Sequence, residues 1–164
     1  MFRLTIIACF IITCFVTLTA CGQNSTIRSR ASQVSVYQIK GDRTERTASV
    51  SAILNENVAP PTAILDANFL QQQLGDGEFG PSDYQTFYFV EVASQDIAQW
   101  IQLLTPLTPS PNYIAPAQPI DWWITRDDFT TLQFYEPSAL FGETHGWVGV
   151  SAQTGRLYIF TFTM

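Results

Sequence analysis

The single histidine of the chain, His145, is the natural starting point for acid–base chemistry. Glu143 precedes it by two residues, and a carboxylate beside an imidazole can move protons near neutral pH. Ser151 follows, and a serine mechanism would require its hydroxyl to reach that imidazole. Residues 149–153 lack the trailing glycine of a nucleophile elbow. We therefore expect this region to lead into a hairpin, and we keep a hydrolase-like enzyme that uses His145 with nearby carboxylates as the alternative.

Residues that could bind a metal ion are sparse. Asp76, Glu78 and Asp83 lie in a glycine-rich loop and carry the carboxylate oxygens that calcium prefers. Their spacing departs from the EF-hand pattern, because the twelfth position of such a loop would be Phe87 instead of a glutamate. A zinc site requires three or four histidine, cysteine or carboxylate ligands, which one histidine does not supply. The pattern favours an ordinary acidic loop, and we predict no metal and no cofactor.

The tryptophans offer a candidate binding surface. Trp122 and Trp123 are adjacent, so in extended backbone they would point to opposite sides, one buried and the other exposed. An exposed indole beside Asp121 and the 127–128 aspartate pair would suit stacking on a sugar or gripping a peptide. The competing interpretation is that these rings fill a core beneath a proline-rich segment. The candidate binding residues are Asp121, Trp122, Trp123, His145 and Trp147.

The N-terminus carries chemistry of another kind. Arg3 gives the first residues one positive charge, and residues 4–18 form an apolar run broken only by threonine. A transmembrane helix needs about 20 apolar residues. A run of this length is instead typical of the hydrophobic region of a signal peptide. Leu18, Thr19, Ala20 and Cys21 follow, so small residues precede a cysteine whose sulfur can form a thioether.

This four-residue segment resembles the lipobox of bacterial lipoproteins. The resemblance covers residues 1–22 only, and it implies cleavage before Cys21 and a diacylglycerol on its sulfur. Two or three acyl chains would make attachment permanent, because each buried methylene contributes about 0.8 kcal/mol. The alternative is an uncleaved anchor helix that contains Cys21. We predict a protein held in a lipid bilayer through Cys21, at the cell membrane or outer membrane, with its domain on the extracytoplasmic side.

Composition and charge limit what the rest of the chain can be. The chain has 8 basic and 14 acidic residues, and this balance disfavours nucleic-acid partners. Phe 12, Tyr 6 and Trp 4 are enough large apolar residues to predict a folded core. Cys9 and Cys14 would leave with the leader, so the domain would hold no disulfide. We divide the chain into a signal peptide (1–20), a lipidated cysteine with a flexible tether (21–33) and one globular domain (34–164).

The first half of the domain mixes strand and helix patterns. Residues 84–93 are apolar on both faces, which predicts a central strand. Residues 62–74 place Ile64, Ala67, Leu70 and Leu74 on one side of a predicted helix that Gly75 would end. We also expect strands at 34–39 and 48–54, and a turn at 41–46.

The second half is mainly β. After a helix at 94–104, five of the nine prolines fall in residues 105–119, which predicts an extended connection over the surface. A strand is expected at 131–136. Strands at 146–151 and 156–163 should form a hairpin whose turn has Gly155 at the position that needs positive φ. The sum is an α+β domain, an antiparallel sheet of four to six strands with two helices packed on it.

No glycine-rich phosphate loop, paired-cysteine motif or basic patch accompanies these elements. The residues of the domain resemble no family that would supply an activity. The sequence therefore favours a non-enzymatic envelope lipoprotein that binds a protein or glycan partner near the membrane. The enzyme that uses His145 remains the second hypothesis.

Overall fold

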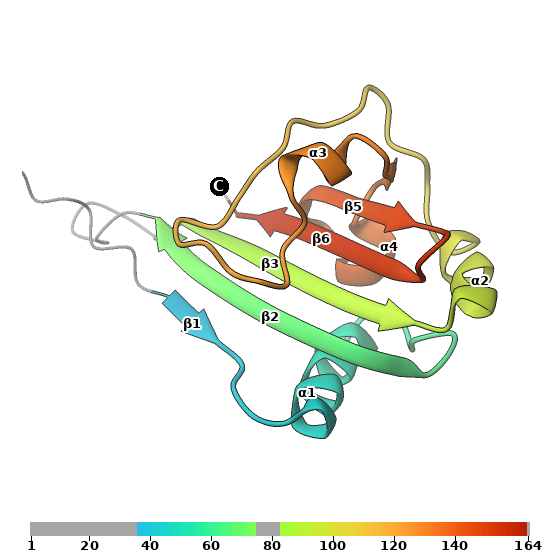
Figure 1. The fold of residues 1–164 in the computed structure, drawn as a ribbon, viewed down its shortest axis with the longest axis horizontal. Helices are drawn as coiled ribbons and strands as arrows, with labels where there is room; N and C mark the ends of the chain where they lie inside the picture. Colours follow the sequence, from blue (N-terminus) through green and yellow to red (C-terminus); the bar gives the residue numbers. More distant parts are fainter. Residues whose placement is uncertain (1–35, 75–82, 164) are drawn as a thin grey trace, which may run out of the picture. The chain divides into compact units, whose positions relative to one another are not determined.

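The computed structural model describes residues 36–74 and 83–163 (Figure 1). All six of its strands join one antiparallel sheet in the order β1-β2-β3-β6-β5-β4. This confirms the predicted α+β class and the antiparallel sheet, and the described residues hold four α-helices where we expected two. In chain order the elements are β1 (Val36–Gln38), α1 (Arg43–Asn55), β2 (Ile64–Leu74), β3 (Asp83–Val92), the 3-10 turn η1 (Ser94–Asp96), α2 (Ile97–Ile101), α3 (Arg126–Phe129), β4 (Gln133–Tyr135), α4 (Ser138–Phe141), β5 (His145–Ser151) and β6 (Arg156–Phe162).

Strand β3 lies inside the sheet, between β2 and β6, as its two apolar faces predict. Phe87 and Phe89 point to one face, whereas Tyr88 and Val90 point to the other, and all four are buried. A strand that is covered on both faces and paired on both edges loses contact with water almost completely. The hydrophobic effect therefore holds β3 at the centre of the domain.

The two faces of the sheet have different covers. On one face, buried residues of α1, α2 and α4 pack against the strands, including Leu54, Trp100 and Leu140. On the other face the cover is residues 105–132, an irregular segment that contains α3. Figure 1 shows α3 and this segment on the side of β5 and β6 opposite α4. We call residues 105–132 the cover segment.

The hairpin of β5 and β6 forms as predicted. Ser151 pairs with Arg156, and the four residues between them make the turn. Gly155 has φ +69°, a backbone conformation that residues with a side chain rarely adopt, and a Cβ added there would meet the carbonyl oxygen of Val92. The glycine therefore allows the hairpin to approach the end of β3 closely.

The first helix corrects the prediction of a turn at 41–46 and a strand at 48–54. Residues Arg43–Asn55 form α1. Asp42 and Glu45 form a capping box: the Glu45 amide donates to Asp42 Oδ1 at 2.9 Å, and the Asp42 amide donates to Glu45 Oε2 at 2.9 Å. The alternation read as a strand comes from small polar residues such as Ser49, whose hydroxyl bonds the Glu45 carbonyl one turn back.

The second correction is β2, which we predicted as a helix. Ile64–Leu74 runs antiparallel to β3 over its whole length, with a register shift between Ile64 and Asp66. Burial follows the two faces of a sheet: Phe69 packs among the helices, and Leu70 packs under the cover segment. Leucine, alanine and glutamine favour helix in isolation, but pairing along a buried strand decides the outcome.

Side-chain hydrogen bonds hold the cover segment in place, one to the sheet and one within the segment itself. Gln72 is buried, and its Oε1 accepts from the Ala117 amide at 3.0 Å while its Nε2 donates to Gln85 Oε1 at 2.8 Å. Tyr113 donates its hydroxyl to the Ile124 carbonyl at 3.0 Å. Residues 105–119, which we predicted as an extended connection, form no helix or strand apart from an isolated bridge between Pro106 and Tyr135, and the Ala117 contact holds them against β2.

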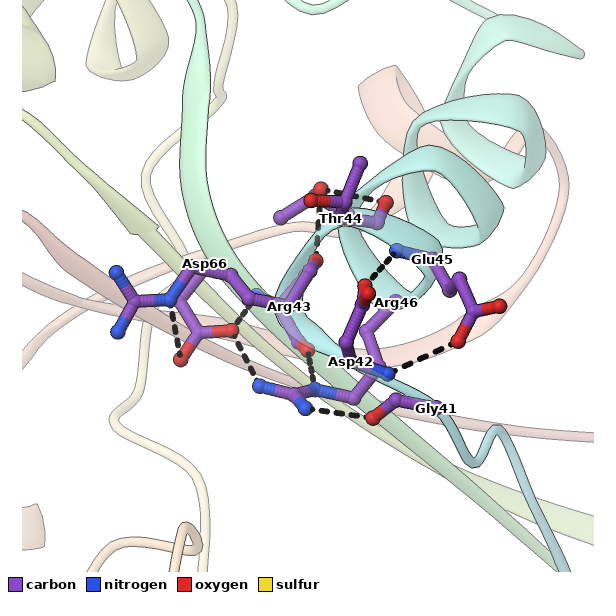
Figure 2. A network of polar contacts seen from close by, with 9 residues as sticks. Gly41, Asp42, Arg43, Thr44, Glu45, Arg46 and Asp66 are labelled. Carbon is purple, nitrogen blue, oxygen red and sulfur yellow. Dashed lines mark hydrogen bonds and ion pairs between the residues drawn. The ribbon is translucent and has the colours of Figure 1, made fainter.

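The two edges of the sheet have different hydrogen-bond partners. Beyond β4, the Leu107 amide donates to the Phe134 carbonyl at 2.9 Å, and the Glu136 amide donates to the Thr105 carbonyl at 2.8 Å. Strand β1 pairs with only part of β2, and the Arg46 side chain reaches β2 beyond the end of that pairing. Its guanidinium donates to the Ala67 carbonyl, and Figure 2 shows the same guanidinium beside Gly41 and Asp66. An arginine side chain thus occupies a backbone acceptor that an edge strand would otherwise leave open.

Candidate functional site

A cleft of about 300 Å³ opens where the cover segment passes over β3 and β6. Residues 121–125 form one wall, and Asp128 of α3 stands beside them. Phe89 of β3 and Tyr158 of β6 line the sheet side, with Arg156 at the start of β6. We call this the Trp122 cleft. Its residues come from three regions of the chain that only the fold brings together.

One aromatic ring of the cleft is more accessible than the others. Trp123, Phe89 and Tyr158 are each less than one-tenth exposed, whereas Trp122 is half-buried. Trp123 also donates its indole N–H to the Ile114 carbonyl at 2.9 Å. Trp122 Nε1 is covered and has no hydrogen-bond partner among the described residues. The exposed part of the Trp122 indole therefore consists of carbon atoms.

Charged groups of both signs border this ring. Asp121 is exposed and forms no hydrogen bond or ion pair within the described residues. The Thr125 hydroxyl donates to Asp128 Oδ2 at 2.8 Å, and its oxygen accepts from the Asp128 amide at 3.2 Å, which caps α3. The Arg156 guanidinium lies 6.0 Å from the centre of the Phe89 ring. Two acceptors and one strong donor thus face the same small volume.

The hydroxyl of Tyr158 stays protonated in this setting. Burial raises the pKa of Tyr158, and the neighbouring Arg156 opposes the rise by its charge and by a hydrogen bond. A neutral phenol both donates and accepts hydrogen bonds. The sheet side of the cleft therefore offers a polar group of either kind.

A second groove lies on the other side of residues 123–125. It measures about 380 Å³ and is lined by the proline-rich part of the cover segment, with Tyr113 and Ile120. None of its lining residues carries a charge. Arg126 lies 4.9 Å from the centre of the Tyr113 ring, next to this groove. The groove is apolar, so it lacks the convergent polar groups of the Trp122 cleft.

The structure brings together three of the five candidate binding residues. Asp121, Trp122 and Trp123 all line the Trp122 cleft. Trp147 is only 3% exposed and packs under the cover segment, with its ring centre 5.7 Å from that of Trp123. It is a core residue, not a lining residue. His145 begins β5, is exposed, and contacts the ring of Phe162 at 5.5 Å.

The serine arrangement that we considered around His145 does not form. His145 and Ser151 stand at opposite ends of β5, and a strand of this length separates its ends by roughly 20 Å. The Ser151 oxygen accepts a hydrogen bond from the Thr154 hydroxyl at 2.8 Å within the hairpin turn. Among residues 36–74 and 83–163, His145 has no hydrogen bond or ion pair to a carboxylate.

Two other predictions fall largely outside the described residues. Cys21, the signal peptide and the tether lie there, and so do Asp76 and Glu78 of the acidic loop. Asp83 is described and begins β3. The described ranges contain no group of three or more side chains placed to hold a metal ion. They also contain no helix that is long and apolar enough to cross a bilayer.

Sequence reasoning missed the residues that the sheet contributes. Phe89, Arg156 and Tyr158 are far from Trp122 in sequence, and they meet because β3 pairs with β6, with Phe89 opposite Tyr158. The available signal was the aromatic face of the last strand, which predicts a covered surface without saying what covers it. Comparison with protein-family models, with curated proteins and with solved structures gave no match.

Proposed function

We propose that this chain is a lipid-anchored protein of the bacterial envelope whose domain binds a partner in the Trp122 cleft, without catalysing a reaction. The observation that supports binding is the convergence of one accessible indole, two carboxylates and a guanidinium on a single cleft of about 300 Å³. A concave site with a few converging polar groups is the usual form of a ligand site. The anchor rests on the segment that ends at Cys21.

The two parts of the proposal support one another physically. A lipidated cysteine would hold the domain close to a membrane, where the local concentration of envelope components is high. A cleft that binds only moderately would then be sufficient. The acidic balance of the chain, 14 acidic against 8 basic residues, disfavours nucleic acid as the partner.

The anchor is tested with Cys21→Ser in the native host. Metabolic labelling with a fatty acid should mark the natural protein and leave the variant unlabelled, because the variant lacks the sulfur that accepts the lipid. The variant should accumulate as a precursor or as soluble protein. Label retained on Cys21→Ser would contradict the anchor.

The cleft is tested on the intact lipidated protein in detergent micelles. Envelope material is separated into a protein fraction and a polysaccharide fraction, and hydrogen exchange of the protein is followed with each. One fraction should protect residues 121–125 and the start of β6. Asp121→Asn should reduce that protection, whereas Tyr37→Ala, an exposed aromatic on β1 outside the cleft, should not. Absence of protection by either fraction would contradict binding at this cleft.

A further inference from the structure

We infer that the ligand of the Trp122 cleft is a carbohydrate, with one sugar ring stacked on Trp122 and its hydroxyls bonded by Asp121, Asp128 and Arg156. This inference rests on the proposed function, and it names the chemical class of the partner.

The size of the cleft favours a ring-sized group. About 300 Å³ is at the small end of ligand pockets. An α-helix with side chains is about 10–12 Å across and would not enter a cleft of this volume. A surface of this kind receives one or two small groups of a larger molecule, as a single unit of a polysaccharide would provide.

The aromatic residues favour stacking over a cation cage. A cage for a quaternary ammonium group needs several ring faces turned toward one point. Here the Phe89 face already has the Arg156 guanidinium over it, and Trp123 is buried with its indole N–H donated to the Ile114 carbonyl. Trp122 alone remains as a platform. The face of an indole carries partial negative charge, and it attracts the weakly positive C–H groups on the flat side of a sugar ring.

The polar groups favour a neutral polyol. Each sugar hydroxyl both donates and accepts, so it can satisfy the acceptor oxygens of Asp121 and Asp128 and the donors of Arg156 together. The cleft has two carboxylates and one guanidinium, an excess of one negative charge. That excess repels an anionic ligand. The Thr125 hydroxyl holds Asp128 Oδ2, which leaves the second carboxylate oxygen to orient toward a ligand.

The strands beneath the cleft disfavour an extended peptide. A peptide that adds to a sheet gains affinity from backbone hydrogen bonds along a free edge. Phe89 belongs to β3 and Tyr158 to β6, and both strands are paired on their two sides. Their backbone groups are already used in the sheet. A peptide would have to bind through side chains alone, whereas a sugar needs only the side chains that are present.

The test uses the intact lipidated protein in micelles and a glycan array of short neutral, amino and acidic oligosaccharides, with trilysine and choline as competing probes. Saturation-transfer NMR and tryptophan fluorescence report binding. At least one neutral or amino sugar should bind. Trp122→Phe should retain affinity, Trp122→Ala should lose it, and Asp121→Asn should weaken it about tenfold, the factor expected for one lost hydrogen bond to a charged group. Tyr37→Ala should bind normally.

Three outcomes overturn the inference in different ways. If no sugar binds but trilysine or choline does, or if only the protein fraction of the envelope protects the cleft, the ligand class is wrong while the binding function stands. If no probe and no envelope fraction binds, both fail together. Asp121 is exposed, so its variant should fold normally even if Trp122→Ala unfolds; equal sugar affinity of Asp121→Asn and the natural protein would also overturn the proposed geometry.

Discussion

Arg46 joins α1 to β2, and its replacement by alanine is the sharpest test of how this domain is held together. The guanidinium donates three hydrogen bonds. One goes to the Ala67 carbonyl at 2.9 Å. The other two go to the Gly41 carbonyl at 3.0 Å and to Asp66 Oδ1 at 2.7 Å, and both residues are labelled in Figure 2. The side chains of Arg46 and Asp66 are 22% and 20% exposed. Water therefore screens this ion pair only in part.

The expected cost follows from that geometry. An exposed ion pair contributes about 0–1 kcal/mol, and breaking a fully buried one costs about 3–5 kcal/mol. The Arg46–Asp66 pair lies between these limits, and Arg46→Ala also leaves the Ala67 carbonyl without its donor. We expect a loss of about 2–3 kcal/mol in the free energy of unfolding. For a domain of this size the midpoint temperature should fall by roughly 6–12 °C.

Arg43→Ala is the matched control, because Arg43 pairs with the same carboxylate. Its Nε lies 3.9 Å from Asp66 Oδ2, and its side chain is 72% exposed. It also stands in the first turn of α1, where a positive charge opposes the helix dipole. Removing it should change the free energy of unfolding by less than about 0.5 kcal/mol.

Differential scanning calorimetry and urea unfolding of the three proteins measure the difference. The effect of Arg46→Ala should persist in about 1 M salt, where the Debye length of about 3 Å screens exposed charges. Arg46→Lys should recover only part of the loss, because an ammonium cannot reproduce a guanidinium fork. Equal effects of Arg43→Ala and Arg46→Ala would refute the reasoning, since they would mean that charge alone matters and geometry does not.

Three further predictions follow from single contacts. Gly155→Ala should lower the free energy of unfolding by about 1–3 kcal/mol, because φ +69° is strained for alanine and the new Cβ meets the Val92 carbonyl oxygen; urea unfolding measures this, and an unchanged midpoint would contradict it. Gln72→Leu should speed hydrogen exchange of the Ala117 amide, which donates to Gln72 Oε1; unchanged protection would mean that the bond does not hold the cover segment. Burial raises the pKa of Tyr88, so the folded state keeps a proton that the unfolded chain releases above about pH 10, and the free energy of unfolding should fall as pH rises beyond that value. Tyr88→Phe should flatten this decline in urea unfolding measured against pH. An unaltered slope of stability against pH would oppose this.

Local patterns predicted the elements whose partners lie close in sequence. Residues 84–93 and the hairpin around Gly155 carry their own signals, an apolar run on two faces and a glycine turn, and both form as expected. The start of α1 also carried a local signal, Asp42 followed three residues later by Glu45, and the strand prediction overlooked it. In that case the information was present in the sequence and was outweighed by an accidental alternation.

Strand β2 and half of the cleft could not be predicted in the same way. The apolar residues of Ile64–Leu74 fit a helix as well as a strand, and only the pairing with β3 decides between them. Asp121 and Trp122 were found from their neighbours in sequence. Arg156 joins them because two strands that are distant in sequence, β3 and β6, pair with each other. The periodicity of apolar residues within one segment does not predict which distant segment it pairs with.

The closeness of the cover segment to the sheet has a consequence for recognition. Gly149 of β5 has no side chain, and a Cβ there would lie 2.6 Å from Leu132 Cδ1, so the end of the cover segment sits directly on the strand. Together with the Gln72 contact at Ala117, this fixes the segment to the sheet near its middle and at its C-terminal end. A ligand would then meet walls that are already in position, and binding would lose little conformational entropy to loop ordering. Association should accordingly be fast, and weak affinity would reflect few contacts, not a slow rearrangement of the protein.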